Sequence, residues 1–344
     1  MINVGILGAT GYVASQLIAI LLKHNEIKIS HIYSNKNDMK DIFETFPSFY
    51  GISDMKYSSD ENYPDDCNLI FSCLPAGESE KYAKKSVESG AKFIDLGSDF
   101  RLKDEKANIK WYGKDFEDKE LHKKAVYGLS EIFEKEIKDS DIIANPGCYP
   151  TSIILGLAPL LSQKIDFLEP IIIDSKSGLT GSGKKLSENS HFINVNENFT
   201  PYAIGGHRHL PEIEQALSKI SGKSIQTVFT PHLLPVNRGI LSSIYINLTE
   251  NIDIDEIHKT YRNFYKDKYF VRILAKGKIA NLRQVQNSNF VNISLHKDNH
   301  TNTLIVISAI DNMIKGAAGQ AVQNMNLMFN FNENEGLNLI PNTF

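Results

Sequence analysis

The chain opens with an alternation of short apolar runs and amphipathic stretches. Apolar runs occupy residues 2–7, 28–33, 68–73 and 92–96, and helical periodicity follows at 12–23 and 79–89. Apolar runs bounded by turn residues are typical of buried parallel strands, and amphipathic helices are the usual connections between them. The pattern therefore predicts an α/β fold for the first part of the chain.

The pattern changes beyond residue 170, where longer apolar runs and more turns replace the regular alternation. Strands are predicted at 170–175, 224–231, 242–248, 289–296 and 303–310. The runs 224–231 and 242–248 are interpreted as an antiparallel pair joined by 232–239. A last helix is predicted over 314–329, and the Asn-rich tail after it is expected to be poorly ordered. This part of the chain therefore forms a second domain.

Length and charge narrow the class of protein. A chain of 344 residues with 42% hydrophobic residues can bury the cores of two domains. Its net charge of −4, without a basic stripe, argues against nucleic acid as a partner. The three cysteines lack the spacing of a disulfide framework, and there is no basic leader or long apolar run, so we expect a cytoplasmic protein without a membrane span.

A glycine-containing turn at residues 8–14 separates the first predicted strand from the first helix. Gly8 permits a tight bend, and Gly11 lets the backbone approach a pyrophosphate. Ala14 stands where a third glycine often occurs. An ordinary turn is the alternative, but a strand before the motif and a helix after it favour a Rossmann-type dinucleotide site.

The second predicted strand ends at Ser34-Asn35-Lys36, where a site that prefers NAD usually carries an acidic residue. A hydroxyl, an amide and a cation are suited to a 2′-phosphate, so this strand end favours NADP. Lys36 as an ordinary solvated lysine is the alternative. The turn that begins at Pro75 follows the third strand and adds a loop at the same edge of the sheet.

Residues 145–152 predict a strand end, a tight turn and a helix start, with Cys148 at the helix N-terminus. Helix N–H groups and the positive end of the dipole favour a thiolate and offer oxyanion donors. A cysteine that is merely buried is the alternative, which we prefer for Cys67 and Cys73. Cys148 is therefore the candidate nucleophile.

Two further segments carry polar chemistry. The Gly- and Ser-rich residues 176–185 are either a flexible linker or a loop that wraps an anion, and the sequence leaves both open. Residues 205–212 place His207, Arg208, His209 and Glu212 in one short stretch. A metal site and a solvated loop are alternatives, but no further ligand cluster accompanies the histidines, so we expect no metal and a histidine acting as general acid–base.

Several of these motifs together resemble the N-acetyl-gamma-glutamyl-phosphate reductase family of arginine biosynthesis, in the aspartate-semialdehyde dehydrogenase-like superfamily. They lie at residues 8–12, 94–102, 126–131, 145–151, 177–185, 207–212 and 316–326, and the resemblance covers almost the whole chain. The sequence departs from the family pattern at Ala14, in place of the third glycine, and at Ala76, where a histidine is common.

The resemblance implies a discontinuous NADP-binding domain, residues 1–147 with 315–344, and an inserted α+β catalytic and substrate domain, residues 148–314. The expected cofactor-binding residues are Gly8, Thr10, Gly11, Tyr12, Val13, Ser34, Lys36, Pro75, Gly319 and Gln320. The expected catalytic residues are Cys148, His209 and His207. The expected substrate-binding residues are Arg101, Glu131, Ser177, Lys184, Lys185 and Arg208. We also expect a homo-oligomer, either a dimer or a tetramer.

The implied reaction is reduction of N-acetyl-gamma-glutamyl phosphate by NADPH through a thioester on Cys148. Either His207 or His209 handles the proton, with a preference for His209 because it lies nearer Glu212. A related acyl-phosphate reductase, acting on aspartyl phosphate or on a carrier-protein-linked aminoadipyl phosphate, is the alternative enzyme. A non-catalytic NADP-sensing regulator is the alternative outside catalysis, although it has no need of Cys148.

Overall fold

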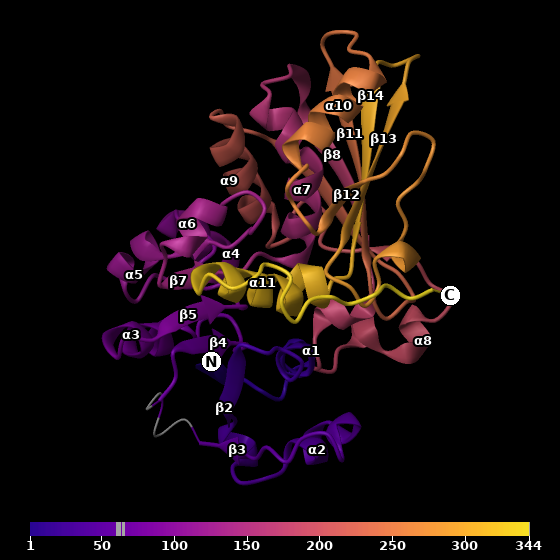
Figure 1. Cartoon of the computed structure of the whole chain (residues 1–344). Helices are drawn as coiled ribbons and strands as arrows, with labels where there is room; N and C mark the ends of the chain where they lie inside the picture. Colours follow the sequence, from indigo (N-terminus) through magenta and orange to yellow (C-terminus); the bar gives the residue numbers. More distant parts are fainter. Residues whose placement is uncertain (60–62, 64–65, 344) are drawn as a thin grey trace. The chain divides into compact units, whose positions relative to one another are not determined.

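The computed structural model describes residues 1–59, 63 and 66–343 and divides the chain into two compact units. Unit 1 comprises Met1–Pro146 and Ala317–Leu337, and unit 2 comprises Gly147–Gly316 and Asn338–Phe344. Figure 1 traces the chain through both units. None of the helices in the described ranges is both long and apolar enough to span a bilayer.

Unit 1 is built on a parallel sheet with strand order β3-β2-β1-β4-β5-β7-β6, which confirms the predicted α/β class. Its strands are β1 (Ile2–Leu7), β2 (Ile27–Tyr33), β3 (Tyr57–Ser58), β4 (Leu69–Ser72), β5 (Lys92–Asp95), β6 (Val126–Tyr127) and β7 (Ile142–Ala144). Its helices are α1 (Tyr12–Leu21), α2 (Ile42–Thr45), α3 (Glu80–Glu88), α4 (Glu105–Tyr112), α5 (Lys119–Lys124), α6 (Glu134–Lys138) and α11 (Gly319–Met328). The strand order reverses beside β1, where the glycine turn lies.

The C-terminal helix α11 packs beside α1 and α6, as Figure 1 shows for the yellow helix among indigo and purple elements. The Asn324 amide donates to the Gly128 carbonyl at 2.8 Å. The Asn326 amide donates to the backbone oxygens of Glu333 and Glu335, and Leu337 is fully buried. The expectation of a poorly ordered tail is therefore wrong for residues 333–337, because a buried side-chain amide of α11 donates hydrogen bonds to their backbone.

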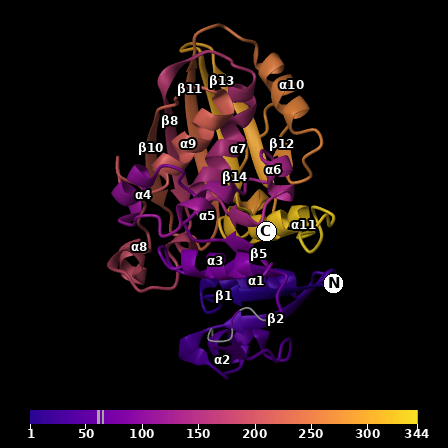
Figure 2. The ribbon, with the colours of Figure 1, turned by 90° about the vertical axis from the view of Figure 1, so that its left-hand side faces the viewer.

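Unit 2 contains a mixed sheet with strand order β12-β13-β14-β11-β8-β10-β9. Its strands are β8 (Phe167–Ser177), β9 (Thr200–Pro201), β10 (Thr227–Leu233), β11 (Ile240–Leu248), β12 (Val271–Ile273), β13 (Val291–Asp298) and β14 (Thr303–Ile310). Its helices are α7 (Cys148–Ser162), α8 (Phe192–Val195), α9 (Leu210–Ser221) and α10 (Ile254–Phe264). Figure 2 shows α7, α9 and α10 on one face of this sheet.

The predicted pairing of residues 224–231 with 242–248 is wrong. Both strands exist as β10 and β11, but β8 lies between them. β10 pairs with β8 in parallel, from Thr227 opposite Ile171, and β11 pairs with it antiparallel, from Ile240 opposite Ser177. The 11 residues of β8 offer enough backbone to pair on both sides along most of their length, so the long strand takes the central place.

Helix α7 contains Pro159, which has no N–H to donate to the carbonyl four residues earlier. That carbonyl belongs to Leu155, and the Tyr265 hydroxyl, just after α10, donates to it at 2.6 Å. The Tyr261 hydroxyl donates to the neighbouring Gly156 carbonyl at 2.7 Å. Two buried tyrosines therefore satisfy backbone groups at the proline and fasten α10 to α7.

We expect Tyr265→Phe to lower the free energy of unfolding by about 1–3 kcal/mol, because a buried carbonyl loses its donor. Tyr269→Phe is the matched control, since Tyr269 is 51% exposed and bonds only to the Asn338 side chain. Urea unfolding monitored by circular dichroism measures both. Equal losses in the two variants would contradict the proposed role of the Leu155 carbonyl.

Candidate functional site

Cys148 is the first residue of α7, as the turn residues before it predict, with Gly147 as the N-cap. Gly147 offers no capping side chain. Its backbone N–H instead donates to Oε1 of Glu212 at 2.8 Å. Glu212 is fully buried in the first turn of α9. The carboxylate therefore fixes the backbone immediately before the candidate nucleophile.

The first turn of α7 leaves few backbone donors for a ligand. The Gly147 N–H is used by Glu212, the Thr151 N–H donates to the Gly147 carbonyl, and Pro150 has no N–H. Within the described ranges, the structure gives the Tyr149 N–H no acceptor. A donor beside the sulfur at the positive end of a helix is the arrangement that stabilises a developing oxyanion.

A cavity of about 410 Å³ in unit 2 brings five of the predicted residues together, namely Cys148, Ser177, His207, Arg208 and His209. The other lining residues are Tyr149, Gly178, Gly181, Ser182, Ser187, Asn189, Tyr202, Ala203, Gly206 and Leu233. Arg208 is exposed, while both histidines are buried. Nucleophile, imidazoles and a cation thus share one concave site of the size that small ligands occupy.

His207 is held as a neutral ring. Its Nδ1 accepts the His209 backbone N–H at 3.1 Å, and its Nε2 lies 3.4 Å from the Tyr202 hydroxyl. Burial, and secondarily the positive charge of Arg208, lowers the pKa of His207 to about 4. Rings of Tyr149, Tyr202 and Phe229 pack around it. His207 is therefore suited to positioning the segment rather than to accepting protons near neutral pH.

His209 presents its ring to the same cavity from the N-cap position of α9. The ring centroids of His207 and His209 are 4.9 Å apart, and His209 contacts Tyr149 edge-on at 6.1 Å. Because His207 accepts the backbone N–H of His209, the peptide carrying the His209 ring is fixed. The two histidines thus differ in their contacts: the His207 ring accepts a backbone hydrogen bond, and the His209 ring is carried by the residue that donates it.

The Gly- and Ser-rich segment after β8 is a fixed loop, so the linker interpretation is wrong. The Leu179 N–H donates to the Val236 carbonyl at 2.9 Å, and the Thr180 hydroxyl donates to the Asn237 carbonyl at 2.6 Å. A Cβ on Gly178 would lie 2.7 Å from the Asn237 oxygen. The loop lines the cavity, while Lys184 and Lys185 lie beyond it on exposed backbone.

A small residue is required where the last helix begins. The π-helical turn Ile314–Ala318 precedes α11, and a Cβ added to Gly316 would lie 2.7 Å from Cβ of Cys148. The size of residue 316 therefore determines the space beside the cysteine.

The glycine turn of unit 1 fits a dinucleotide. Gly8 has φ +67°, and a Cβ there would lie 2.7 Å from the Cys73 carbonyl oxygen, so only glycine lets the turn pass this close. Gly11 is the N-cap of α1, without a capping side chain and without an acidic residue in the first turn. The N–H groups of Tyr12 and Val13 at this helix start are thus suited to an anion such as a pyrophosphate.

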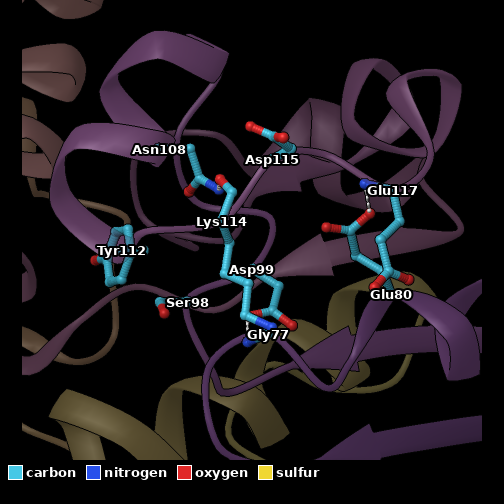
Figure 3. A pocket seen from close by; sticks show the side chains of 9 residues that line it. All are labelled: Gly77, Glu80, Ser98, Asp99, Asn108, Tyr112, Lys114, Asp115 and Glu117. Atoms are coloured by element: carbon cyan, nitrogen blue, oxygen red, sulfur yellow. Dashed lines mark hydrogen bonds between the residues drawn. The ribbon is translucent and has the colours of Figure 1, made fainter.

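The backbone that follows Pro75 is fixed by Asp99, whose side chain lies beside Gly77 in Figure 3. The Asp99 carboxylate accepts the Gly77 N–H at 2.6 Å and the Ser79 N–H at 2.8 Å. The space beside them measures only about 10 Å³, and the Lys114 side chain lies against Gly77. This pocket holds at most a water, so its residues support the turn instead of binding a larger ligand.

Other predicted residues of unit 1 make structural contacts. Arg101 Nε donates to the Asn145 carbonyl at 2.8 Å, and Glu131 accepts from the Gln323 amide at 2.9 Å. The Gln320 amide donates to the Ser130 hydroxyl at 2.5 Å, while its buried oxygen has no partner in the described part of the chain. That orphaned oxygen is a group that a bound carboxamide could satisfy.

The remaining cysteines and possible metal ligands lie in unit 1. Burial, with a smaller contribution from Asp95, raises the pKa of Cys73 to about 12, so Cys73 is an unreactive thiol. In residues 1–59, 63 and 66–343, the sole group of three possible metal ligands is His31, Asp66 and Cys67, and it includes neither His207 nor His209.

Sequence reasoning missed the aromatic surroundings of the site. Tyr202 and Phe229 both contact His207. Tyr202 lies only five residues before it but belongs to no recognisable motif, and Phe229 comes from β10, beyond α9 in the sequence. Tyr149 was visible only as the residue after the cysteine. The hydrophobic pattern marked Phe229 as a strand residue, and nothing in it indicated a place against an imidazole.

Two family models match the chain. Residues 3–140 match the model described as semialdehyde dehydrogenase, NAD binding domain, and residues 148–312 match the one described as semialdehyde dehydrogenase, dimerisation domain. The chain is 51% identical over 344 residues to N-acetyl-gamma-glutamyl-phosphate reductase of Clostridium botulinum, covering 100% of both chains. It is 49% identical over 352 residues to the enzyme of that name from Brachyspira hyodysenteriae, again covering 100% of both.

Solved structures share the fold at low identity. Aspartate semialdehyde dehydrogenase II from Vibrio cholerae matches with a TM-score of 0.74 at 18% identity, covering 96% of this chain and 98% of that one. Aspartate semialdehyde dehydrogenase with NADP from Candida albicans matches with a TM-score of 0.67 at 17% identity, covering 96% and 98%. Together with the two family models, these matches confirm the predicted fold class, a Rossmann-type dinucleotide-binding domain combined with an α+β domain.

We expect His207→Asn to flatten the pH dependence of unfolding between pH 6.5 and about 4. The folded-state pKa lies below the ordinary value of 6.5, so in this range the unfolded chain binds a proton that the folded chain does not. This contribution is fully present above pH 6.5 and is lost as the pH falls towards 4. Urea unfolding at several pH values measures it, with His191→Asn at an exposed histidine as control. An unchanged slope would contradict a depressed pKa.

Proposed function

The chain belongs to the semialdehyde dehydrogenase family, and we propose that it reduces N-acetyl-gamma-glutamyl phosphate to N-acetylglutamate 5-semialdehyde and phosphate, with NADPH, in arginine biosynthesis. Full-length identity of about half to reductases of that name supports this substrate. The observation that carries the proposal is the cavity that contains Cys148 at a helix start together with His207, Arg208 and His209.

In the proposed reaction the Cys148 thiolate attacks the acyl carbon, and the bond from that carbon to the phosphate oxygen breaks. A thioester forms, inorganic phosphate leaves, and the Tyr149 N–H stabilises the oxyanion before phosphate departs. Arg208 and Ser177 face the anionic groups of the substrate in the same cavity. NADPH, when bound, supplies the hydride that turns the thioester into an aldehyde.

We assign proton transfer to His209. His207 stays neutral at pH 7 because burial and Arg208 lower its pKa, and its Nδ1 already accepts a backbone N–H. His209 takes the proton from the thiol of Cys148 and later protonates the oxygen formed on reduction. It takes that proton back as the carbon–sulfur bond breaks, which releases the aldehyde and the Cys148 thiolate. Glu212 accepts the N–H of Gly147, the residue before Cys148, and so positions the backbone that carries the nucleophile.

The proposed cofactor domain is discontinuous and consists of residues 1–147 with 315–344, and residues 148–314 form the catalytic and substrate domain. The matched NAD-binding model establishes a nicotinamide dinucleotide domain, and NADP is our proposal. The residues proposed to bind it are Gly8, Thr10, Gly11, Tyr12, Val13, Ser34, Lys36, Pro75, Gly319 and Gln320. Ser34 and the exposed Lys36 follow β2 and suit a 2′-phosphate. Arg101, Glu131, Lys184 and Lys185 stay predicted substrate contacts.

The alternatives have less support. The aspartate semialdehyde dehydrogenases share the fold at 18% identity or below among the solved structures compared, against 51% for the reductase from Clostridium botulinum. A non-catalytic NADP sensor would not need a buried carboxylate that fixes the turn before Cys148.

A homo-oligomer, dimer or tetramer, is consistent with the matched dimerisation domain. The surface best suited to contact a second copy is the face of the unit 2 sheet opposite its helices. On this face Val228, Ile172 and Tyr245 form a row across three strands, and their side chains are 47%, 46% and 37% exposed. We infer that a second copy covers this row. The cytoplasmic location expected from the cysteines stays a prediction.

The test of the function is phosphate-dependent reduction of NADP with N-acetylglutamate semialdehyde, compared with aspartate semialdehyde. We expect activity with the first aldehyde, and Cys148→Ser should abolish it while retaining NADP binding, because the hydroxyl is a far weaker nucleophile. Cys67→Ser is the control for loss of a thiol. Substantial turnover by Cys148→Ser would exclude the thioester, and preference for aspartate semialdehyde would exclude the substrate.

The two histidines should differ in kinetics. We expect His209→Asn to lose roughly 10²- to 10⁴-fold in kcat, the usual range for a positioned general acid–base. His207→Asn should lose less and keep the near-neutral limb of the pH–rate profile. If that limb disappears in His207→Asn and persists in His209→Asn, the assignment is reversed.

For the cofactor, we expect the wild type to prefer NADP over NAD in kcat/KM. The double variant Ser34→Asp, Lys36→Ala should reduce this ratio by about tenfold or more, because a carboxylate repels the 2′-phosphate and binds a ribose diol. Lys40→Ala, at a nearby exposed lysine, is the control. A wild type that uses NAD equally well would refute the interpretation of this strand end.

A further inference from the structure

A second cavity in unit 2 lies along one side of α10 and has a volume of about 280 Å³. Asp255, His258, Lys259, Arg262 and Asn263 line it from the helix, and Lys276 lines it from the segment after β12. The helical residues are spaced three and four apart, so they form one continuous stripe. None of these six residues lines the cavity that contains Cys148.

The lining of this cavity carries an excess of positive charge. Lys276 forms an ion pair with Asp255, which neutralises both side chains. Lys259 and Arg262 form no ion pair with a carboxylate in residues 1–59, 63 and 66–343. Two exposed cations one turn apart on α10 therefore line the cavity without a carboxylate partner among the described residues, so an anion placed there would be attracted by both.

A buried histidine lines the same cavity. His258 is only 5% exposed, and its Nε2 has no hydrogen-bond partner in the part of the chain that the structure describes. Burial lowers the pKa of His258, and Arg262, Lys276 and, more weakly, His296 of β13 lower it further against the opposing charge of Asp255. A buried polar atom left without a partner in a basic cavity indicates a ligand that would accept its hydrogen bond.

From these observations we propose that the α10 cavity binds a small doubly charged oxyanion, either free phosphate or the phosphate group of a small metabolite. Lys259 and Arg262 supply charge and donors, and Asn263 adds an amide donor. A protonated His258 would donate from the buried side. The volume leaves room for a compact organic group beside the oxyanion.

Binding of such an anion should be linked to proton uptake by His258. The anion opposes the repulsion from Arg262 and Lys276, so the protonated imidazole becomes more favourable when the cavity is filled. Affinity should therefore increase as the pH falls from about 8 to about 5.5. The groups that set this dependence are Asp255, Lys259 and Arg262 on α10, Lys276 after β12, and His296 on β13.

The test uses isothermal titration calorimetry on the full chain with sulfate, whose charge does not change over this pH range. We expect the double variant Lys259→Gln, Arg262→Gln to weaken sulfate binding at least about tenfold. Lys266→Gln is the matched control, because this lysine follows the same helix, is exposed and lies outside the cavity. Equal binding by the double variant and the wild type would overturn the proposal.

A second arm tests the histidine. His258→Gln should abolish the increase in sulfate affinity at low pH, and an increase that persists in this variant would overturn the role of His258. Titrations with inorganic phosphate and with glycerol 2-phosphate then distinguish the two sources. Tighter binding of the ester indicates a small organic phosphate, and tighter binding of phosphate indicates the free ion. Because the residues tested do not line the Cys148 cavity, failure here leaves the proposed reductase activity untouched.

Discussion

The hydrogen bond from the Gly147 N–H to the Glu212 carboxylate is the interaction on which the site depends. It joins the cap of α7 to the first turn of α9 inside a fully buried environment, where an unsatisfied carboxylate would be costly. Cys148 follows Gly147 directly, and His209, the N-cap of α9, lies three residues before Glu212. This contact therefore ties together the two backbone segments that carry the proposed nucleophile and the proposed acid–base. The same bond occupies the Gly147 N–H, so the Tyr149 N–H is the donor that we propose for the oxyanion.

The arrangement of the two histidines follows from their backbone. His207 accepts the N–H of His209, which turns the imidazole of His207 into a support for the peptide that carries the second ring. Aromatic rings of Tyr149, Tyr202 and Phe229 exclude water from His207 and contribute to its low pKa through burial. A support that stays uncharged does not repel Arg208, so the cation and the ring can be neighbours in sequence without strain.

Local chemistry was predictable from the sequence, and long-range pairing was not. Gly8 and Cys148 lie in turns whose geometry depends on adjacent residues, so the strand, turn and helix were recognised. The placement of β8 between β10 and β11 depends on competition among apolar strands, which periodicity alone does not resolve. Phe229 was missed for the same reason, because it reaches His207 from β10, a strand that lies beyond α9 in the sequence.

The charge of the cavity constrains which group can move protons. An anionic acyl phosphate needs a cation such as Arg208, and that cation adds to the burial that lowers the pKa of His207. With a pKa of about 4, His207 does not take up a proton near pH 7. In the proposed mechanism the two tasks fall to two positions, one on each side of Arg208. His207 is a neutral support, and His209 presents a second ring from the N-cap of α9. The paired histidines thus suit the proposed reaction, in which an anion binds beside a nucleophile that must lose its proton.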